Sequence, residues 1–403
     1  MTSIRTNLAN GLALFGIAGA SIGVILFGNA FTNTFMALCL LGCLLHPNIW
    51  NSASWKMVPI GLWLGLALFL WAVVASMWST GSADDIGETL RKYREFLLLP
   101  MMWLVVHQLK LIQCARISIL VATLVSVFIT YLLWVGWYSH PIYGATQLSL
   151  KNHIFFNVSV SFLFYVALFG LFKRSWIISS VIVLFVGATF FAIFAIEDGR
   201  TAYIFIPALV GWFIWIQIPN IKFKVVALIG LCGFCAFTYW QAPLVKQNVD
   251  MTKEGLEAYF QGEFSYTSTG VRIGWIMTGL EGWTHKPILG HGTGSYPSEM
   301  MNYVPEGQEK LKSANPHQQY VLFLFEQGLI GALLFVAFLL ALAWQTILQK
   351  DYLSQGIVLM MIVGSGINSS FLDGTESQFY WILLLLFLKP KGWRVSDTQD
   401  KPV

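Results

Sequence analysis

Residues 318–348 read QQYVLFLFEQGLIGALLFVAFLLALAWQTIL, an apolar run in which Glu326 is the one charged residue. A helix needs roughly 20 mostly apolar residues to cross about 30 Å of hydrocarbon, so this run is long enough to span a membrane. Hydrophobic residues make up 56% of the 403-residue chain, charged residues 11%, and the mean hydropathy is +0.66. Such a chain has too few polar residues to cover a soluble core. The sequence therefore predicts an all-α polytopic membrane protein.

Further apolar stretches predict about twelve transmembrane helices in all. The second, fourth and twelfth stretches are short, so the count could also be eleven or ten. In chain order the stretches lie near 8–28, 30–45, 58–78, 95–107, 117–138, 153–172, 176–196, 201–218, 224–242, 318–348, 352–368 and 378–389.

The basic residues predict the orientation, because lysine and arginine concentrate in cytoplasmic loops. With the N-terminus inside, thirteen basic residues face the cytoplasm, and the short loops opposite hold only five, Arg91, Lys92, Arg94, Lys151 and Arg200. We therefore expect both termini in the cytoplasm. The net charge of +4 follows from this topology and gives no reason to expect nucleic-acid binding.

One polar segment interrupts the hydropathy pattern and predicts the domain organisation. Residues 243–316 lie between the ninth and tenth spans, on the extracytoplasmic side, and are too many for a simple connection. We expect them to form a helical cap, with a helix over 268–283 and a glycine-rich turn over 287–300; the glycine spacing there does not fit a dinucleotide fingerprint. The remaining predicted parts are a membrane bundle split into 1–242 (spans one to nine) and 317–389 (spans ten to twelve), and a cytoplasmic tail at 390–403.

A histidine, His317, precedes the long apolar run. Asn315 and Pro316 suit the start of a helix, which would place His317 in its first turn at the extracytoplasmic mouth of the tenth span. The same helix face would then carry Val321, Leu324, Gly328 and Gly331, and the two glycines would let a neighbouring helix approach closely. His317 would face the bundle interior. The alternative is a histidine that caps a helix or bonds a neighbour without a chemical role.

Two arginines are expected on the same side of the membrane. Arg200 follows the seventh span in the loop EDGR, and Arg272 lies on the expected cap helix. The planar guanidinium group binds phosphate oxygens through paired, charge-assisted hydrogen bonds, so both residues are candidates for holding a phosphorylated lipid headgroup. The alternatives are an ion pair with Glu197 or Asp198 for Arg200, and a solvated surface charge for Arg272.

The spacing of these residues resembles a known family. His317 and Gln318, then nine residues, Gly328, two residues and Gly331 are similar to the signature of bacterial O-antigen ligases, the related O-antigen polymerases and bacterial protein O-oligosaccharyltransferases. Arg200 after the seventh span, and R-x-x-W followed by P-x-x-G-x-G, resemble the same family; the latter residues are Arg272, Trp275, Pro287, Gly290 and Gly292.

The resemblance implies a GT-C-like glycosyltransferase of the bacterial inner membrane with its active site facing the periplasm. It would transfer O-antigen from undecaprenyl diphosphate to the lipid A core in lipopolysaccharide biosynthesis. Arg200 and Arg272 would stabilise the departing diphosphate, and His317 would take the proton of the acceptor hydroxyl. No nucleophilic carboxylate stands out, so we expect inversion in a single displacement. We expect neither a metal nor another cofactor.

Other polar and aromatic residues are candidates for substrate binding. Arg91, Lys92 and Arg94 could bind phosphates of the lipid A core or pair with Asp84, Asp85 and Glu88. Asp373 could orient His317, or simply stabilise the turn before Gly374. Aromatic rings could stack on sugars or anchor the chain at the membrane interface. The candidates for substrate binding are thus Arg91, Lys92, Arg94, Gln318, Asp373, Trp275 and Tyr296, with Tyr266 and Trp283 as further possible stacking rings.

Three alternative functions remain at this stage. A polymerase would use the same donor but a second lipid-linked glycan as acceptor. A protein oligosaccharyltransferase is expected to carry a sizeable extra C-terminal region. A flippase or transporter would place charged residues near the bilayer midplane, whereas most candidates here lie at one face. The sequence leaves the sugar repeat, the acceptor hydroxyl and the oligomeric state open.

Overall fold

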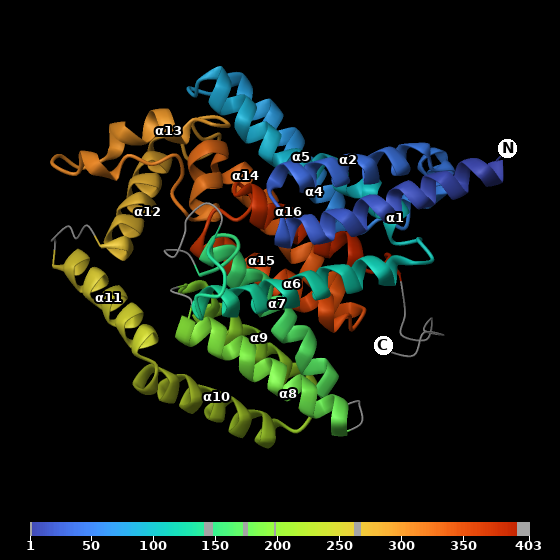
Figure 1. The fold of residues 1–403 in the computed structure, drawn as a ribbon. Coiled ribbons are helices and arrows are strands. Elements are labelled where there is room, and N and C mark those ends of the chain that lie inside the picture. Colours follow the sequence, from blue (N-terminus) through green and yellow to red (C-terminus); the bar gives the residue numbers. More distant parts are fainter. Residues whose placement is uncertain (1, 141–147, 172–175, 197–198, 262–266, 393–403) are drawn as a thin grey trace. The chain divides into compact units, whose positions relative to one another are not determined.

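The computed structural model describes residues 2–140, 148–171, 176–196, 199–261 and 267–392, and the regular structure in these ranges is helical throughout (Figure 1). The α-helices are α1 (Thr2–Leu26), α2 (Asn29–Leu45), α3 (Ser52–Trp55), α4 (Ile60–Ala75), α5 (Ala83–Val106), α6 (Ile112–Trp134), α7 (His153–Leu171), α8 (Trp176–Phe191), α9 (Thr201–Gln217), α10 (Ile221–Gln241), α11 (Pro243–Phe260), α12 (Ser268–His285), α13 (Tyr296–Glu299), α14 (Gln319–Leu348), α15 (Tyr352–Ile367) and α16 (Gly374–Phe387). Short 3-10 helices span Pro47–Trp50, Ser76–Trp78, Met300–Tyr303 and Glu309–Leu311, and a π-helical turn spans Ala192–Ile196.

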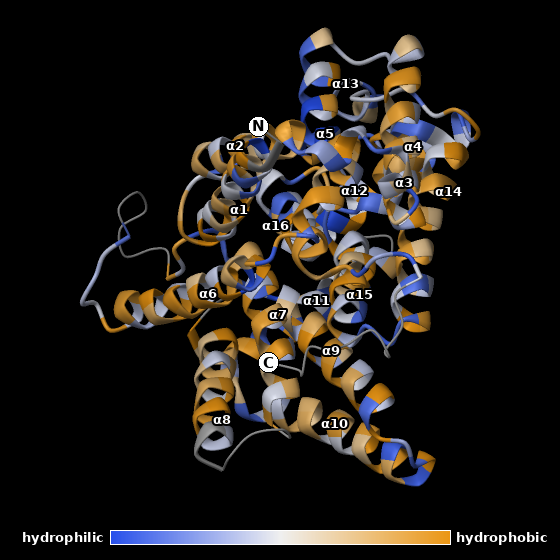
Figure 2. Ribbon diagram, turned by 90° about the vertical axis from the view of Figure 1, so that its right-hand side faces the viewer, coloured by the Kyte–Doolittle hydropathy of each residue, from blue (hydrophilic) through white to orange (hydrophobic). Residues whose placement is uncertain are grey.

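Each apolar stretch expected from the sequence falls on a helix. Among the described residues, seven helices are long and apolar enough to cross a membrane: Ile4–Leu26, Ile60–Trp78, Ile112–Trp134, His153–Leu171, Ser179–Ile196, Ile221–Gln241 and Gln319–Leu348. Apolar residues dominate most of these long helices (Figure 2). The chain is therefore a polytopic helical membrane protein.

The chain divides into two compact units. The first unit comprises the chain up to Ala13, Leu40–Leu109 and the chain from Met251 onward, and the second comprises Leu14–Cys39 and Lys110–Asp250. The segment expected to form the cap belongs partly to each unit, because α11 crosses the boundary between them. From Met251 onward, the expected cap belongs to the same unit as α14. Within that unit, α12 and α13 pack against α14 (Figure 1).

Helix α14 is not continuous. Gly328 has φ 64° and ψ −166°, a conformation essentially restricted to glycine, and it breaks the helix into two segments. A regular helix would join Leu329 N–H to the Phe325 carbonyl and Ile330 N–H to the Glu326 carbonyl. Here the two N–H groups instead donate to the carbonyls of Pro287 (2.8 Å) and Ile288 (3.5 Å). The sequence did not predict this break.

The loop that replaces those helical bonds is the glycine-rich turn. His291 N–H donates to the Phe325 carbonyl (2.9 Å), and Gly292 N–H donates to the Glu326 carbonyl (2.7 Å). The four backbone groups released by the break are therefore all bonded, which matters because an unsatisfied buried backbone group costs about 1–3 kcal/mol. Non-helical backbone at membrane depth is tolerated only where protein satisfies it in this way.

Glycine is required on both sides of this junction. Gly290 has φ 69°, and a β-carbon there would press on the backbone of Glu326 and Gly328. A β-carbon on Gly328 would meet the Ile288 carbonyl. Gly328 therefore accommodates the loop and not a neighbouring helix, which corrects the role expected from its spacing.

The far end of the loop is fastened to α4 and the residues after it. Thr293 Oγ1 donates to the Ala72 carbonyl (2.7 Å), and Ser79 Oγ donates to the Thr293 carbonyl (2.8 Å). Trp71 Nε1 donates to the Gln327 carbonyl (3.3 Å), next to the break. Helix α4, the loop and α14 thus form one bonded assembly within the first unit.

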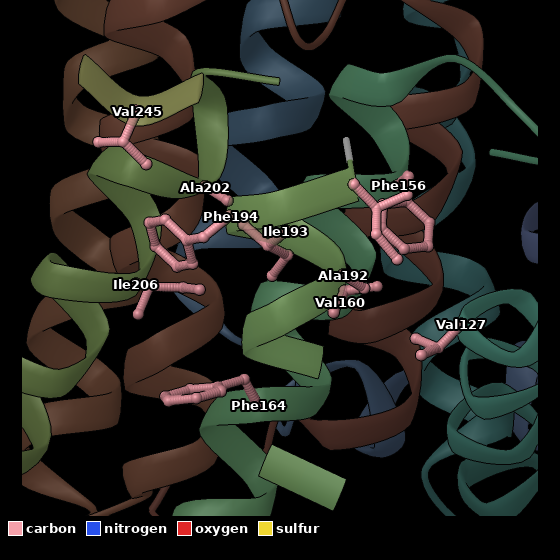
Figure 3. Packing of buried hydrophobic residues seen from close by; sticks show 11 residues of the cluster. Val127, Phe156, Val160, Phe164, Ala192, Ile193, Phe194, Ala202, Ile206 and Val245 are labelled. Atoms are coloured by element: carbon pink, nitrogen blue, oxygen red, sulfur yellow. The ribbon is translucent and has the colours of Figure 1, made fainter. Parts of the chain in front are cut away.

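In the second unit, α7, α9 and the π-helical turn share a buried apolar cluster (Figure 3). Phe156 and Val160 of α7 pack with Ile193 of the turn and with Ala202 and Ile206 of α9. Because Ala202 lies in the first turn of α9, the cluster fixes the position at which that helix begins. Arg200 is the residue that precedes this helix.

We predict that Gly328→Ala destabilises the protein. Alanine at this φ and ψ is strained by roughly 1–3 kcal/mol, and its methyl group would collide with the loop. Thermal unfolding of the detergent-solubilised variant should therefore begin well below that of the wild type. Gly87→Ala is the matched control, because Gly87 lies in α5 with open space around it. Equal melting temperatures for Gly328→Ala and the wild type would show that the break is dispensable.

Candidate active site

His317 lies just before α14 and not on it. Its backbone has φ 50°, an unusual left-handed conformation for a non-glycine residue, and its N–H donates to Asn315 Oδ1 (2.8 Å). Gln318 is the residue that caps the helix, since its Oε1 accepts a hydrogen bond from Val321 N–H. The prediction that His317 lies in the first helical turn, on the face of Gly328 and Gly331, was therefore wrong. The left-handed turn, and not a helical register, directs its ring.

The imidazole of His317 is held by two neighbours. Its ring centroid lies 4.7 Å from that of Trp275, with the planes inclined by 31°. Its Nδ1 lies 3.3 Å from Oδ1 of Asn368, the residue that follows α15. Asn368 in turn donates from Nδ2 to Oε1 of Glu376, in the first turn of α16 (2.9 Å). Helices α12, α15 and α16 thus all contribute to the surroundings of this half-buried histidine.

The electrostatic surroundings favour a neutral imidazole. Burial lowers the pKa of His317 most, the hydrogen bond to Asn368 raises it, the positive charge of Arg272 lowers it, and the negative charge of Asp373 raises it. The net pKa lies below the ordinary value of 6.5. At neutral pH the ring is therefore able to accept a proton.

Arg272 and Trp275 lie one turn apart on α12, so both face the region of His317. Arg272 is exposed and donates from Nη1 to the carbonyl of Ile367, the last residue of α15 (3.4 Å). Trp275 is fixed by a hydrogen bond from Nε1 to the Leu311 carbonyl (2.7 Å). The structure therefore brings together His317, Arg272 and Trp275.

Two other predicted residues have structural partners. Asp373 caps α16, because its Oδ1 accepts hydrogen bonds from Thr375 N–H (3.0 Å) and Glu376 N–H (3.2 Å). Tyr296 is fully buried, and its hydroxyl donates to the Trp275 carbonyl (3.1 Å). Asp373 thus acts on His317 through its charge and not through a hydrogen bond. Tyr296 holds the backbone of Trp275 through the hydrogen bond to its carbonyl.

The basic run on α5 is engaged in ion pairs. Lys92 Nζ lies 2.8 Å and Arg91 Nη2 lies 4.0 Å from Oε1 of Glu88, and Arg94 Nε lies 3.6 Å from Oε1 of Glu95. Glu88, one of the partners considered from the sequence, thus pairs with Arg91 and Lys92, whereas Arg94 pairs with Glu95.

The same turn of α5 reaches the start of α14. Tyr93, inside the basic run, accepts a hydrogen bond from Gln319 Nε2 (3.2 Å), and Gln319 Oε1 accepts one from Phe371 N–H (2.9 Å). Gln319 is fully buried. It therefore joins α5, α14 and the connection between α15 and α16 two residues after His317.

Arg200 lies in the second unit. Its Nε donates to Asn248 Oδ1 on α11 (3.1 Å), and the side chain is half-buried. Glu197 and Asp198, the partners considered from the sequence, lie outside the described residues, as does Tyr266. Trp283 is a described candidate ring and donates from Nε1 to the Pro287 carbonyl (3.0 Å).

Sequence reasoning missed Asn368 and Glu376. In the hydropathy pattern Asn368 marks only the end of an apolar stretch, and Glu376 lies only in the connection that contains Asp373. The signal that could have found them is their position, since polar residues at the ends of membrane helices often face a functional site. The contact between residues 317 and 368 depends on how α14 and α15 pack, which spacing alone does not reveal.

The comparison with known proteins covers the segment that contains the sequence motifs. No curated protein matches the chain. Residues 184–336, which include Arg200, Arg272, the glycine-rich turn, His317 and Gly331, match the family model described as O-antigen ligase. The resemblance predicted from the motifs is therefore confirmed, because this segment of the chain is similar to the O-antigen ligase family.

Proposed function

We propose that the protein is an O-antigen ligase of the bacterial inner membrane. It transfers O-antigen glycan from undecaprenyl diphosphate to the lipid A core at the periplasmic face, during lipopolysaccharide biosynthesis. In this proposal the chain has about twelve transmembrane helices in a GT-C-like arrangement, with both termini in the cytoplasm. The observation that carries it is the match of residues 184–336, since that segment holds the histidine and both arginines of the motif.

The surroundings of His317 support the chemical role assigned to it. A general base needs a neutral form at the working pH and a fixed direction. Burial lowers the pKa of His317, and Trp275 and Asn368 hold the ring on two sides. The acceptor hydroxyl gives its proton to the imidazole while its oxygen attacks the anomeric carbon. The bond from that carbon to the diphosphate oxygen breaks in the same step, which inverts the configuration.

Arg272 is suited to the leaving group. As the glycosidic bond breaks, negative charge gathers on the diphosphate, and a fixed cation stabilises that state more than the bound substrate. Arg272 is exposed beside His317, and its contact with the Ile367 carbonyl at the end of α15 leaves further donors of the guanidinium for phosphate oxygens. Arg200 has the same proposed role on the strength of the motif.

The remaining candidates are assigned by their positions in the first unit. Trp275 provides a ring beside His317 on which a sugar could stack, and the basic run Arg91, Lys92 and Arg94 is proposed to bind phosphates of the acceptor. The buried Tyr296 and the capping residues Gln318 and Asp373 hold this surface in shape.

The first test separates a ligase from a polymerase. Purified protein would be incubated with undecaprenyl-diphosphate-linked O-antigen and lipid A core, with a chelator present, and the products separated on a gel. We expect a ladder of glycans on the lipid A core. Longer lipid-linked chains with an unmodified core would identify a polymerase, and the absence of both products would contradict glycosyl transfer.

In the same assay, His317→Ala and His317→Gln should each lose roughly 10²–10⁴-fold in turnover, because neither side chain can take the proton. Glutamine can still form hydrogen bonds, so near-normal turnover of His317→Gln would restrict His317 to binding.

Arg272→Ala should lower turnover by roughly 10²–10³-fold, the usual effect of removing one donor that stabilises developing charge. Arg200→Ala should act in the same direction. Lys253→Ala is the control for loss of a positive charge, since Lys253 is exposed on α11 and pairs only with Glu257 among the described ion pairs. Normal transfer by a well-folded Arg272→Ala variant would remove that arginine from the mechanism.

The pH dependence tests the electrostatic role of Asp373. Activity requires neutral His317, so it should fall on the acid side below pH 6.5, because the pKa of His317 is lowered. The charge of Asp373 raises that pKa, so Asp373→Asn should lower it further and move the acid limb of kcat/KM to lower pH. Asparagine is also a good helix cap, so α16 should keep its start. An unchanged acid limb would show that Asp373 acts only as a cap.

A further inference from the structure

Asn368 and Glu376 form a chain of hydrogen bonds that ends on His317. The Nδ2 amide of Asn368 donates to Glu376 Oε1 (2.9 Å), and Asn368 Oδ1 lies 3.3 Å from His317 Nδ1. Asn368 is 7% exposed and Glu376 is 1% exposed, so water competes little with either bond. Neither residue belongs to the motifs or to the segment matched by the family.

The chemistry of the amide gives this chain a direction. An asparagine side chain has one end that only donates and one end that only accepts. In the structure the NH₂ end of Asn368 faces Glu376 and donates to its Oε1. The carbonyl end therefore faces His317, and an accepting oxygen requires a proton on Nδ1. In a neutral imidazole the other nitrogen, Nε2, then carries the lone pair.

Other contacts prevent the groups of this chain from turning. Glu376 lies in the first turn of α16, and Asp373 holds its backbone N–H. The Trp275 ring lies against His317 and is itself fixed to the Leu311 carbonyl. Rotation of the imidazole by half a turn would lose the bond to Asn368.

We propose that Asn368 and Glu376 are positioning residues that fix His317 in the tautomer with a basic Nε2. The proposal rests on the function proposed above, because it assigns the nitrogen that accepts the proton of the acceptor hydroxyl. Neither residue touches the substrate. Without them both tautomers are populated and the ring turns more freely. A fraction of the protein then carries a proton on Nε2, the nitrogen that must accept one.

Removing either residue should lower kcat and leave KM nearly unchanged. Asn368→Leu removes the contact to His317, and Glu376→Leu removes the acceptor that orients Asn368. We expect kcat to fall by roughly 10-fold or more, though by less than the loss of the base itself, which costs about 10²–10⁴-fold. Ser365→Ala is the matched control: Ser365 is fully buried near the end of α15, and its hydroxyl has no hydrogen-bond partner among the described residues.

The decisive variant exchanges the two groups. In Asn368→Asp with Glu376→Gln, the amide of residue 376 donates to the carboxylate of residue 368, which again accepts from His317 Nδ1. This double variant should recover a kcat within a few-fold of the wild type. A carboxylate beside the imidazole favours its charged form, so the acid limb of kcat/KM should move to higher pH. The limb moves only if residue 368 lies against the imidazole, and the recovery of kcat then shows that an acceptor at this position is what the wild-type Asn368 supplies.

The controls separate failure of this proposal from failure of the proposed function. A wild type without transfer activity, or a fully active His317→Ala, would refute the function or the base. With an active wild type and an inactive His317→Ala, wild-type kcat in folded Asn368→Leu and Glu376→Leu would overturn the positioning role. An unshifted acid limb in the double variant would overturn it as well. If neither leucine variant folds, the double variant decides, because it keeps the size of both side chains.

Discussion

The structure around His317 depends on the backbone pairing between the break in α14 and the glycine-rich turn. Two helical hydrogen bonds are lost at Gly328, and four bonds to residues 287–292 replace them. This exchange is possible only because Gly290 and Gly328 both lack a β-carbon, so that the two backbones can meet. The loop is therefore hydrogen-bonded directly to the backbone of α14 and is not a flexible connection.

The pairing has a direct consequence for the candidate active site. The glycine-rich turn follows α12, so fastening it to α14 sets where α12 lies along that helix. Helix α12, which precedes the turn in the chain, carries Arg272 and Trp275. His317, which follows the turn, lies just before α14. His291 adds to this arrangement, since its Nε2 lies 2.9 Å from the Gly282 carbonyl on α12 and its ring stacks on Phe325. The contact between Trp275 and His317 is thus fixed from both sides.

Much of the fold could be predicted because it follows from local composition. The apolar stretches fall on helices, and 268–283 is helical, since both depend on hydropathy over a single segment. The sequence predictions that were wrong concern features that depend on two segments of the chain at once. The sequence of 318–348 reads as an unbroken helix, and only its contact with 287–292 explains why Gly328 breaks it. His317 was misplaced by the same reasoning, because its left-handed backbone is not visible in a helical pattern.

The same distinction applies to the residues of the candidate site. His317, Arg272 and Trp275 lie in motifs whose spacing is short enough to be recognised in one sequence. Asn368 and Glu376 are separated from His317 by the whole of α14 and α15, and nothing local distinguishes them from polar residues that end a helix. Their role follows from the chemistry of the contact: an asparagine held at its donor end by a carboxyl group can present only its acceptor end to a histidine. A motif can therefore indicate the proposed base, but the side chains proposed to determine which of its nitrogens is basic come from the packing of α15 and α16.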